Sequence, residues 1–163
     1  MKRTQIDVDR LIGELRLDCS QLEDQARTND RANSRVLNGA TDSLDYSALG
    51  YTIHNLYGIM GNACLRISKF FENGLSKESW HKELLDRMLV SIPRLRPAFL
   101  SRDAYLLIDE LRGFRHVFRN LYNRDLDADR VSAIQKKVPQ AIVAFESAVT
   151  VYISFLEELR MEL

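Results

Sequence analysis

The chain has 163 residues, of which 45% are hydrophobic and 28% charged, a composition typical of one globular domain and not of a disordered segment. Its 23 basic and 23 acidic residues cancel, which excludes a general nucleic-acid coat protein, and its seven Gly and three Pro are few for a β-barrel or β-sandwich. No uninterrupted apolar run approaches the roughly 18 residues of a membrane helix, and the first residues lack a signal-peptide core, so we expect one cytoplasmic domain over residues 1–163 with no membrane contact.

Apolar residues recur with a spacing near 3.6 along most of the chain, which predicts helices. The first is expected from Thr4 to Asn29. The polar stretch from Asn29 to Asp42 is interpreted either as a loop or as a continuation of that helix. A second helix is expected to begin at Asp42, whose side chain can cap it, and to end at Asn73-Gly74. Three glycines inside it indicate either close packing against another helix or a kink, namely Gly50, Gly58 and Gly61.

The second half of the chain predicts three more helices. One begins near Ser76 and ends near Ser91, and two prolines keep the following connector out of a helix. Another begins at the cap Ser101 and reaches about Asn123. The last runs from Asp127 to Leu163, with a kink at Pro139. The predicted fold class is therefore all-α, an up-and-down bundle of about five helices whose last helix is kinked at Pro139.

Cysteine and histidine spacing gives no support for a metal site. Cys19 and Cys64 are far apart in the sequence, and each lies in a helix-like apolar pattern. We expect both to be reduced core residues. No CxxC or HExxH spacing occurs, so we predict neither a metal nor another cofactor.

The predicted fourth helix carries a row of arginines without matching acids. From Arg94 to Arg124 there are seven Arg and three acids, and no acid follows Leu111. At 100° per residue the basic and polar side chains gather within about a third of the circumference, opposite an apolar face. Like charges at this spacing repel, whereas guanidinium forks suit phosphate. The row is therefore either an anion-binding surface or a solvated basic face, and it consists of Arg112, Arg115, His116, Arg119 and Asn123.

Three histidines could titrate near neutral pH. His116 lies among the arginines, whose charge is expected to lower its pKa and to favour the neutral form that acts as a base. A catalytic and a structural role both stay open for it. For His54, and for His81, which follows Trp80 directly, a hydrogen-bonded structural histidine is the favoured interpretation. The alternative is that His54, Trp80 and His81 lie in or beside the functional site.

Four stretches of the chain together resemble HEPN-domain proteins of the HepT-like kind, over about Tyr46 to Leu159. The fullest is the signature helix, residues 110–122, with the sequence ELRGFRHVFRNLY. The others are residues 53–57, 80–85 and 126–131. The resemblance implies a helical bundle that dimerises through the helix carrying Arg112 to Tyr122. It also implies a metal-independent ribonuclease, the toxin of a toxin–antitoxin pair, whose partner is a minimal nucleotidyltransferase antitoxin that adenylylates a tyrosine beside the active site.

The motif of that family has an Arg, a polar residue, a His a few positions later, one more residue and a Tyr. Arg115, His116 and Tyr122 match the Arg, the polar residue and the Tyr, whereas Asn120 stands where the motif has His. Cleavage of RNA by its 2′-OH needs groups that accept and donate protons, with cations over the phosphate. Asn transfers no proton near pH 7.

Two hypotheses follow from this departure. In the first, the chain is a ribonuclease whose catalytic residues are Arg115, His116 and Asn120, with Arg112 and Arg119 binding the RNA phosphate. In the second, it is a degenerate, non-catalytic subunit that binds a nucleotidyltransferase, a nucleotide or RNA without cutting. Tyr122 is the predicted modification site, and an aromatic residue at the edge of the core is its alternative interpretation.

Overall fold

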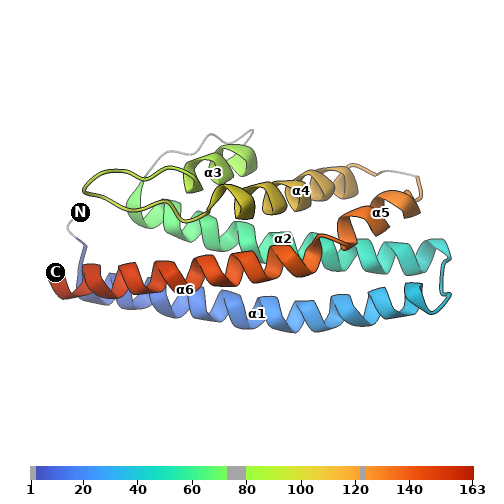
Figure 1. Cartoon of the computed structure of the whole chain (residues 1–163), viewed down its shortest axis with the longest axis horizontal. Helices are drawn as coiled ribbons and strands as arrows, with labels where there is room; N and C mark the ends of the chain where they lie inside the picture. Colours follow the sequence, from blue (N-terminus) through green and yellow to red (C-terminus); the bar gives the residue numbers. More distant parts are fainter. Residues whose placement is uncertain (1–2, 73–79, 122–123) are drawn as a thin grey trace.

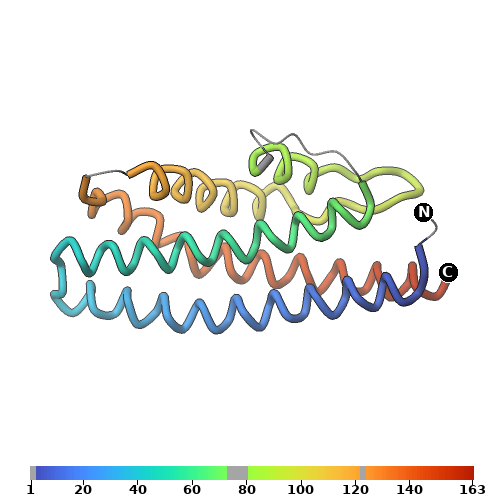
Figure 2. The backbone as a smooth tube through the Cα atoms, turned by 180° about the vertical axis from the view of Figure 1, so that it is seen from behind, coloured from blue at the N-terminus to red at the C-terminus, as the bar shows by residue number. Residues whose placement is uncertain are grey.

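The computed structural model describes residues 3–72, 80–121 and 124–163. All elements named in this part of the chain are helices, so the predicted all-α class is confirmed. Three long helices lie side by side, α3 and α4 cover one side of them, and the two termini lie at the same end (Figures 1 and 2). The helices are α1 (Gln5–Leu37), α2 (Ser43–Phe71), α3 (Trp80–Met88), α4 (Arg102–Arg119), α5 (Ala128–Gln135) and α6 (Val138–Glu162).

The predicted helix starts at Asp42, Ser101 and Asp127 are confirmed by their caps. The Asp42 carboxylate accepts hydrogen bonds from the amides of Leu44 and Asp45, at 2.9 and 3.1 Å, and so caps α2. The Ser101 hydroxyl accepts one from the amide of α4 residue Ala104, and Asp127 caps α5 in the same way. Each such cap stabilises a helix by about 1 kcal/mol.

The first helix is longer than its apolar pattern indicated. Of the two interpretations of the stretch after Asn29, the continuation is correct up to Leu37, and the loop begins only at Asn38. The chain turns at Gly39, whose φ of 100° is a left-handed conformation that glycine adopts without strain. The predicted end of the second helix at Asn73-Gly74 and the predicted start of the third near Ser76 lie outside the described residues.

A buried polar cluster explains why α1 continues. Asn29 is 1% exposed, and its amide group exchanges two hydrogen bonds of 2.8 Å with the amide of Gln135 on α5. Asn29 Nδ2 also donates to the hydroxyl of Thr52 on α2, at 2.9 Å. Because the Asn29 side chain makes its hydrogen bonds to other helices, it stabilises the bundle from inside α1 and does not end the helix.

The predicted kinked C-terminal helix is confirmed as one joined helical stretch, Ala128–Glu162, whose break lies two to three residues before Pro139. The chain divides into α5 and α6 at Lys136 and Lys137, and Pro139 lies in the first turn of α6. Proline lacks an amide hydrogen, which is not needed in a first turn, and it disfavours helical geometry at the residue before it. The predicted extension of α4 to about Asn123 is too long, since α4 ends at Arg119.

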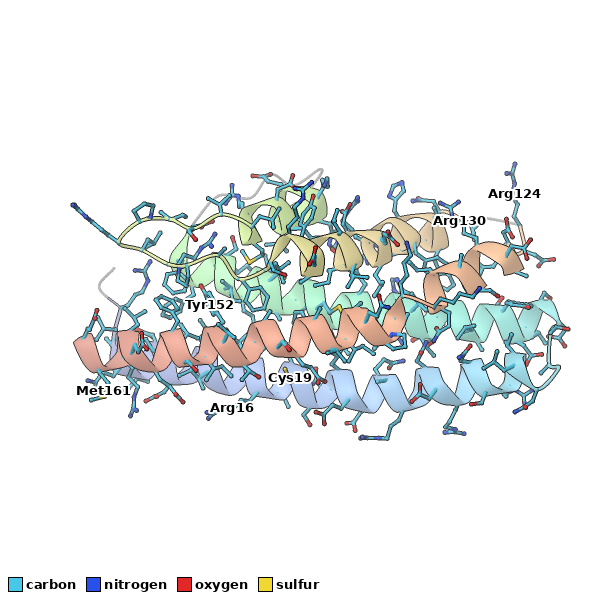
Figure 3. The ribbon with its side chains drawn as sticks, in the orientation of Figure 1. Arg16, Cys19, Arg124, Arg130, Tyr152 and Met161 are labelled. Atoms are coloured by element: carbon cyan, nitrogen blue, oxygen red, sulfur yellow. The ribbon has the colours of Figure 1, made fainter. Side chains whose placement is uncertain are left out.

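Glycine packing is confirmed at one of the three positions in α2. A methyl group at Gly50 would lie 2.8 Å from Leu126 and 3.3 Å from Phe118, so this glycine lets α4 and the link to α5 approach α2 closely. A methyl group at Gly58 would meet nothing within 4 Å. The two cysteines are unpaired as expected, with Cys64 buried and Cys19 half-buried between α1 and α6 (Figure 3).

The connector between α3 and α4 is held by one buried arginine. The side chain of Arg96 donates to the backbone oxygens of Arg87, Val90 and Pro97, at 2.8 to 3.1 Å, and pairs with Glu72 after α2. Because these bonds join the ends of α2 and α3, they fix α3 against α2 and thereby position His81.

By length and composition alone, the helical stretch Ala128–Glu162 could cross a membrane, with a mean hydropathy of 1.4 over 18 residues. The sequence excluded a membrane helix because no uninterrupted apolar run is long enough. By mean hydropathy this exclusion does not hold, because Glu146 is the only charged residue from Val138 to Leu156. A core helix of a bundle meets the same criterion. In α6 the core stripe consists of Val138, Ala141, Phe145, Val149, Tyr152 and Leu156.

Candidate functional site

The arginine row of α4 divides into paired and unpaired members. Arg112 is paired within its own helix, with Nε 2.7 Å from Asp109. In the part of the chain that the structure describes, no carboxylate lies within 4 Å of Arg115 or Arg119. Arg124 lies beyond the helix and extends away from the bundle (Figure 3). The charge of Arg112 is therefore balanced by an acid, whereas the charges of Arg115 and Arg119 are not balanced by any acid among the described residues.

Arg115 is half-buried at the wall of a cavity of about 430 Å³. Its guanidinium carbon lies 5.9 Å from the ring centre of Tyr57, which provides an aromatic face for the charge. Burial and the charge of Arg119 lower the Arg115 pKa. The lining residues, none of them acidic, come from four helices and are Gln25, His54, Asn55, Gly58, Ile59, Gly61, Asn62, His81 and Arg115.

His54 enters this cavity from α2 with its ring fixed by aromatic neighbours. The ring centre lies 5.4 Å from that of Phe118 on α4 and 6.4 Å from that of Tyr51. His54 Nδ1 is buried and has no hydrogen-bond partner in the part of the chain that the structure describes. Leaving such an atom unsatisfied costs about 1–3 kcal/mol. Burial lowers the His54 pKa, and the charges of Arg115 and Arg119 lower it further, so the neutral imidazole is favoured.

His81 enters the same cavity from α3 and is held by Tyr57. Nδ1 of His81 lies 3.1 Å from the Tyr57 hydroxyl, which donates to it when the histidine proton is on Nε2. Burial raises the Tyr57 pKa, so that side chain stays a neutral hydroxyl. Burial, followed by the charges of Arg115, Arg119 and Arg112, lowers the His81 pKa to about 4. Both histidines of the cavity are therefore neutral at pH 7.

The other predicted site residues that the structure describes do not line this cavity. His116 is exposed on α4, and Arg119 is exposed one turn beyond Arg115. Asn120 is the C-cap of α4, and its side-chain amide donates to the backbone oxygen of His116 at 2.7 Å. Tyr122 and the side chain of Trp80 lie outside the described residues.

The structure thus brings Arg115 together with His54 and His81, two histidines for which the sequence favoured a structural role. Gly58 and Asn55 also line the cavity and were not predicted. One sequence signal was present, because His54 and Gly58 are four residues apart and therefore share one face of a helix. Periodicity alone does not show that this face turns toward α4.

A fixed cation beside neutral imidazoles, with no acid in the lining, suits a phosphate group and proton transfer. A second cavity of about 850 Å³ lies between the start of α1 and the end of α2. It holds acids as well as bases, and Arg66 there already pairs with Asp18 at 3.0 Å. The cavity beside Arg115 is therefore the better candidate for binding an anion.

Comparison with models of protein families matches residues 48–156 to a family described as HepT-like protein. The match covers two thirds of the chain and includes the whole cavity lining except Gln25. It also includes the four stretches that carry the resemblance in the sequence. No curated protein and no solved structure matches the chain.

Proposed function

The chain belongs to the HepT-like protein family, and on that premise we propose that it is a ribonuclease toxin in which Arg115 binds the phosphate of the cleaved bond. The family suggests a toxin–antitoxin context in general. The observation that carries the proposal is the placement of Arg115, whose guanidinium is half-buried, has no carboxylate within 4 Å among the described residues, and lines a cavity with two histidines.

Arg115 matches the chemistry of RNA cleavage. When the 2′-oxygen attacks phosphorus, negative charge grows on the non-bridging phosphate oxygens. A guanidinium that donates two parallel hydrogen bonds to those oxygens stabilises this charge, most effectively where water is partly excluded. A carboxylate in the lining would repel the phosphate, and none is present among the nine lining residues.

The proposal includes the partners expected for such a toxin. These are an RNA substrate, a second copy of the chain bound through α4, and a minimal nucleotidyltransferase antitoxin that adenylylates Tyr122. The outer side of α4 suits a helix contact, because Leu106 is 47% exposed and Gly113 has no atom within 4 Å of a methyl group built on it. Intact mass after co-expression with the nucleotidyltransferase tests the modification, which Tyr122→Phe should abolish. An unmodified wild-type chain would contradict this part.

One observation favours the alternative of a non-catalytic subunit that binds the nucleotidyltransferase, a nucleotide or RNA. Asn120 stands at the position of the motif histidine, and its side chain is bonded to the last turn of α4. His116, the predicted substitute, is exposed and does not line the cavity. This alternative expects RNA binding and a stable complex without cleavage.

Expression of the chain alone in bacteria tests the proposed function. Wild-type protein should arrest growth and degrade RNA, and Arg115→Ala should abolish both at equal protein level. Arg102→Ala is the matched control, because Arg102 is exposed in the first turn of α4 and far from the cavity lining. Growth and intact RNA with the wild-type chain, or full toxicity with Arg115→Ala, would contradict the proposal.

A further inference from the structure

The cavity beside Arg115 contains a histidine that the family motif does not include. We propose that His54 on α2 is the general base of the reaction and takes the proton of the RNA 2′-OH. This inference rests on the proposed function and deepens it, because it assigns the proton transfer that Asn120 is unable to perform. His54 lines the same cavity as Arg115, so we expect one phosphodiester unit bound there to contact both side chains.

His54 is held in place but left chemically unsatisfied. Phe118 and Tyr51 fix the plane of its ring, at 5.4 and 6.4 Å between ring centres. Its buried Nδ1 has no hydrogen-bond partner among the described residues, although buried ring nitrogens in proteins are normally hydrogen-bonded. Because Nδ1 is closed off from solvent, a ligand in the cavity meets the other ring nitrogen, Nε2, which is not among the buried atoms that lack a partner.

The cavity is open directly beside this ring. Gly58 is four residues after His54 and lies on the same face of α2, and a methyl group there would meet nothing within 4 Å. Glycine at position 58 therefore leaves space next to the imidazole, and a side chain at this position would reduce that space. The cavity of about 430 Å³ is within the range of small-ligand sites, and a nucleotide unit is of this size class.

The other two histidines are less suited to this role. His116 is exposed on α4 and does not line the cavity. His81 lines it, but its Nδ1 is already bonded to the Tyr57 hydroxyl, which orients this ring against the wall. His54 is therefore the histidine that combines a place in the cavity with an unsatisfied nitrogen.

The proposed step conserves atoms and charge. His54 accepts the 2′-OH proton while the 2′-oxygen forms a bond to phosphorus, and Arg115 stabilises the phosphate oxygens. The bond from phosphorus to the 5′-oxygen then breaks, and this oxygen takes a proton from solvent water. The products are a 2′,3′-cyclic phosphate and a 5′-hydroxyl, and His54 returns its proton to solvent.

The charges around His54 favour its neutral form. Arg115 and Arg119 from α4 act on it, and His81 from α3 lines the same cavity. Burial lowers the His54 pKa, and the two arginines lower it further, so the base stays active below the ordinary histidine pKa of 6.5. We expect the cleavage rate to fall only as the pH drops through this lowered value.

Cleavage of a fluorescent oligoribonucleotide by the purified full-length chain, in buffer with EDTA, tests the assignment. His54→Phe keeps a ring against Phe118 but removes both nitrogens, and it should slow cleavage by about 100-fold or more. Ser47→Ala, which removes an exposed hydroxyl two turns earlier in α2 and outside the cavity lining, should retain the wild-type rate. The mass of the 5′ fragment should show a cyclic phosphate, and an oligonucleotide with 2′-deoxyribose at the cut should stay intact.

Imidazole rescue separates a catalytic role from a structural one. His54→Ala leaves space beside Gly58, so added imidazole should restore part of the lost rate, with the pH dependence of free imidazole. If wild-type protein cleaves and His54→Phe cleaves equally fast, or if imidazole restores nothing to a folded His54→Ala, the assignment is wrong and the proposed function stands. If the wild-type chain does not cleave RNA, both are wrong.

Discussion

At the level of single residues, Arg115 differs from its neighbour Arg112 in what surrounds it. Arg112 has Asp109 at 2.7 Å, so its charge is balanced whether or not a ligand is present. Arg115 faces Tyr57, two neutral histidines and the charge of Arg119. Partial burial, followed by repulsion from Arg119, disfavours the charged form of Arg115, and a bound anion would offset both, which is the arrangement expected at a phosphate site.

His81 makes stability depend on pH. Its pKa is about 4 in the folded chain and near 6.5 in the unfolded chain, so between these values the unfolded chain binds more protons. The free energy of unfolding should therefore fall as the pH is lowered from 6.5 toward 4. Urea unfolding at several pH values checks this, and His81→Gln should reduce the slope in that window.

Thr150→Ala provides the control for this experiment. Thr150 is exposed on α6, its hydroxyl donates to the backbone oxygen of Glu146 in the same helix, and it does not line the cavity. It should keep the wild-type slope. An unchanged slope in His81→Gln would show that His81 is not the group responsible.

At the level of helices, the caps and the proline break follow local rules, and these were predictable. Each cap side chain accepts a hydrogen bond from a backbone amide two or three residues later, so the whole interaction lies within a few residues of sequence. The caps are Asp42, Ser101 and Asp127. The extension of α1 was not predictable in this way. It depends on Asn29 meeting Gln135, 106 residues later, and no local pattern contains that contact.

The Asn29–Gln135 pair should show strong coupling. Asn29→Ala leaves the buried Gln135 amide without two of its bonds, which should cost about 1–3 kcal/mol of unfolding free energy. The double variant Asn29→Ala/Gln135→Ala should cost clearly less than the sum of the two single variants. A double-mutant cycle in urea measures this, and additive losses would contradict the interhelical amide pair.

Two glycines of α2 provide a matched comparison of packing. Alanine is better than glycine in a helix by about 1 kcal/mol. Gly58→Ala should gain this stability, because the methyl group meets nothing within 4 Å. Gly50→Ala should gain less or lose stability, because Leu126 at 2.8 Å has to move. Thermal unfolding of both variants checks the order, and equal stability would contradict the close contact at Gly50.

At the level of the whole molecule, the site is assembled from helices that are distant in the sequence. The resemblance and the charge pattern identified α4 and Arg115, because both signals lie within one helix. The cavity needs α2, α3 and α4 together. Arg96 holds α3 in place, and Gly50 lets α4 pack closely against α2. For this reason sequence periodicity favoured a structural role for His54 and His81, whereas their positions in space place them with Arg115.

The central claim is that the cavity beside Arg115 binds the phosphate of RNA. Fluorescence anisotropy with a 2′-O-methyl oligoribonucleotide measures this binding directly, because the blocked 2′-oxygen prevents cleavage. Arg115→Ala should raise Kd by about 10- to 100-fold, the loss expected for hydrogen bonds to a charged group. Arg160→Ala, at the exposed end of α6 where Arg160 pairs with Asp9, should leave Kd unchanged. Equal affinities of wild-type protein and Arg115→Ala would contradict the account.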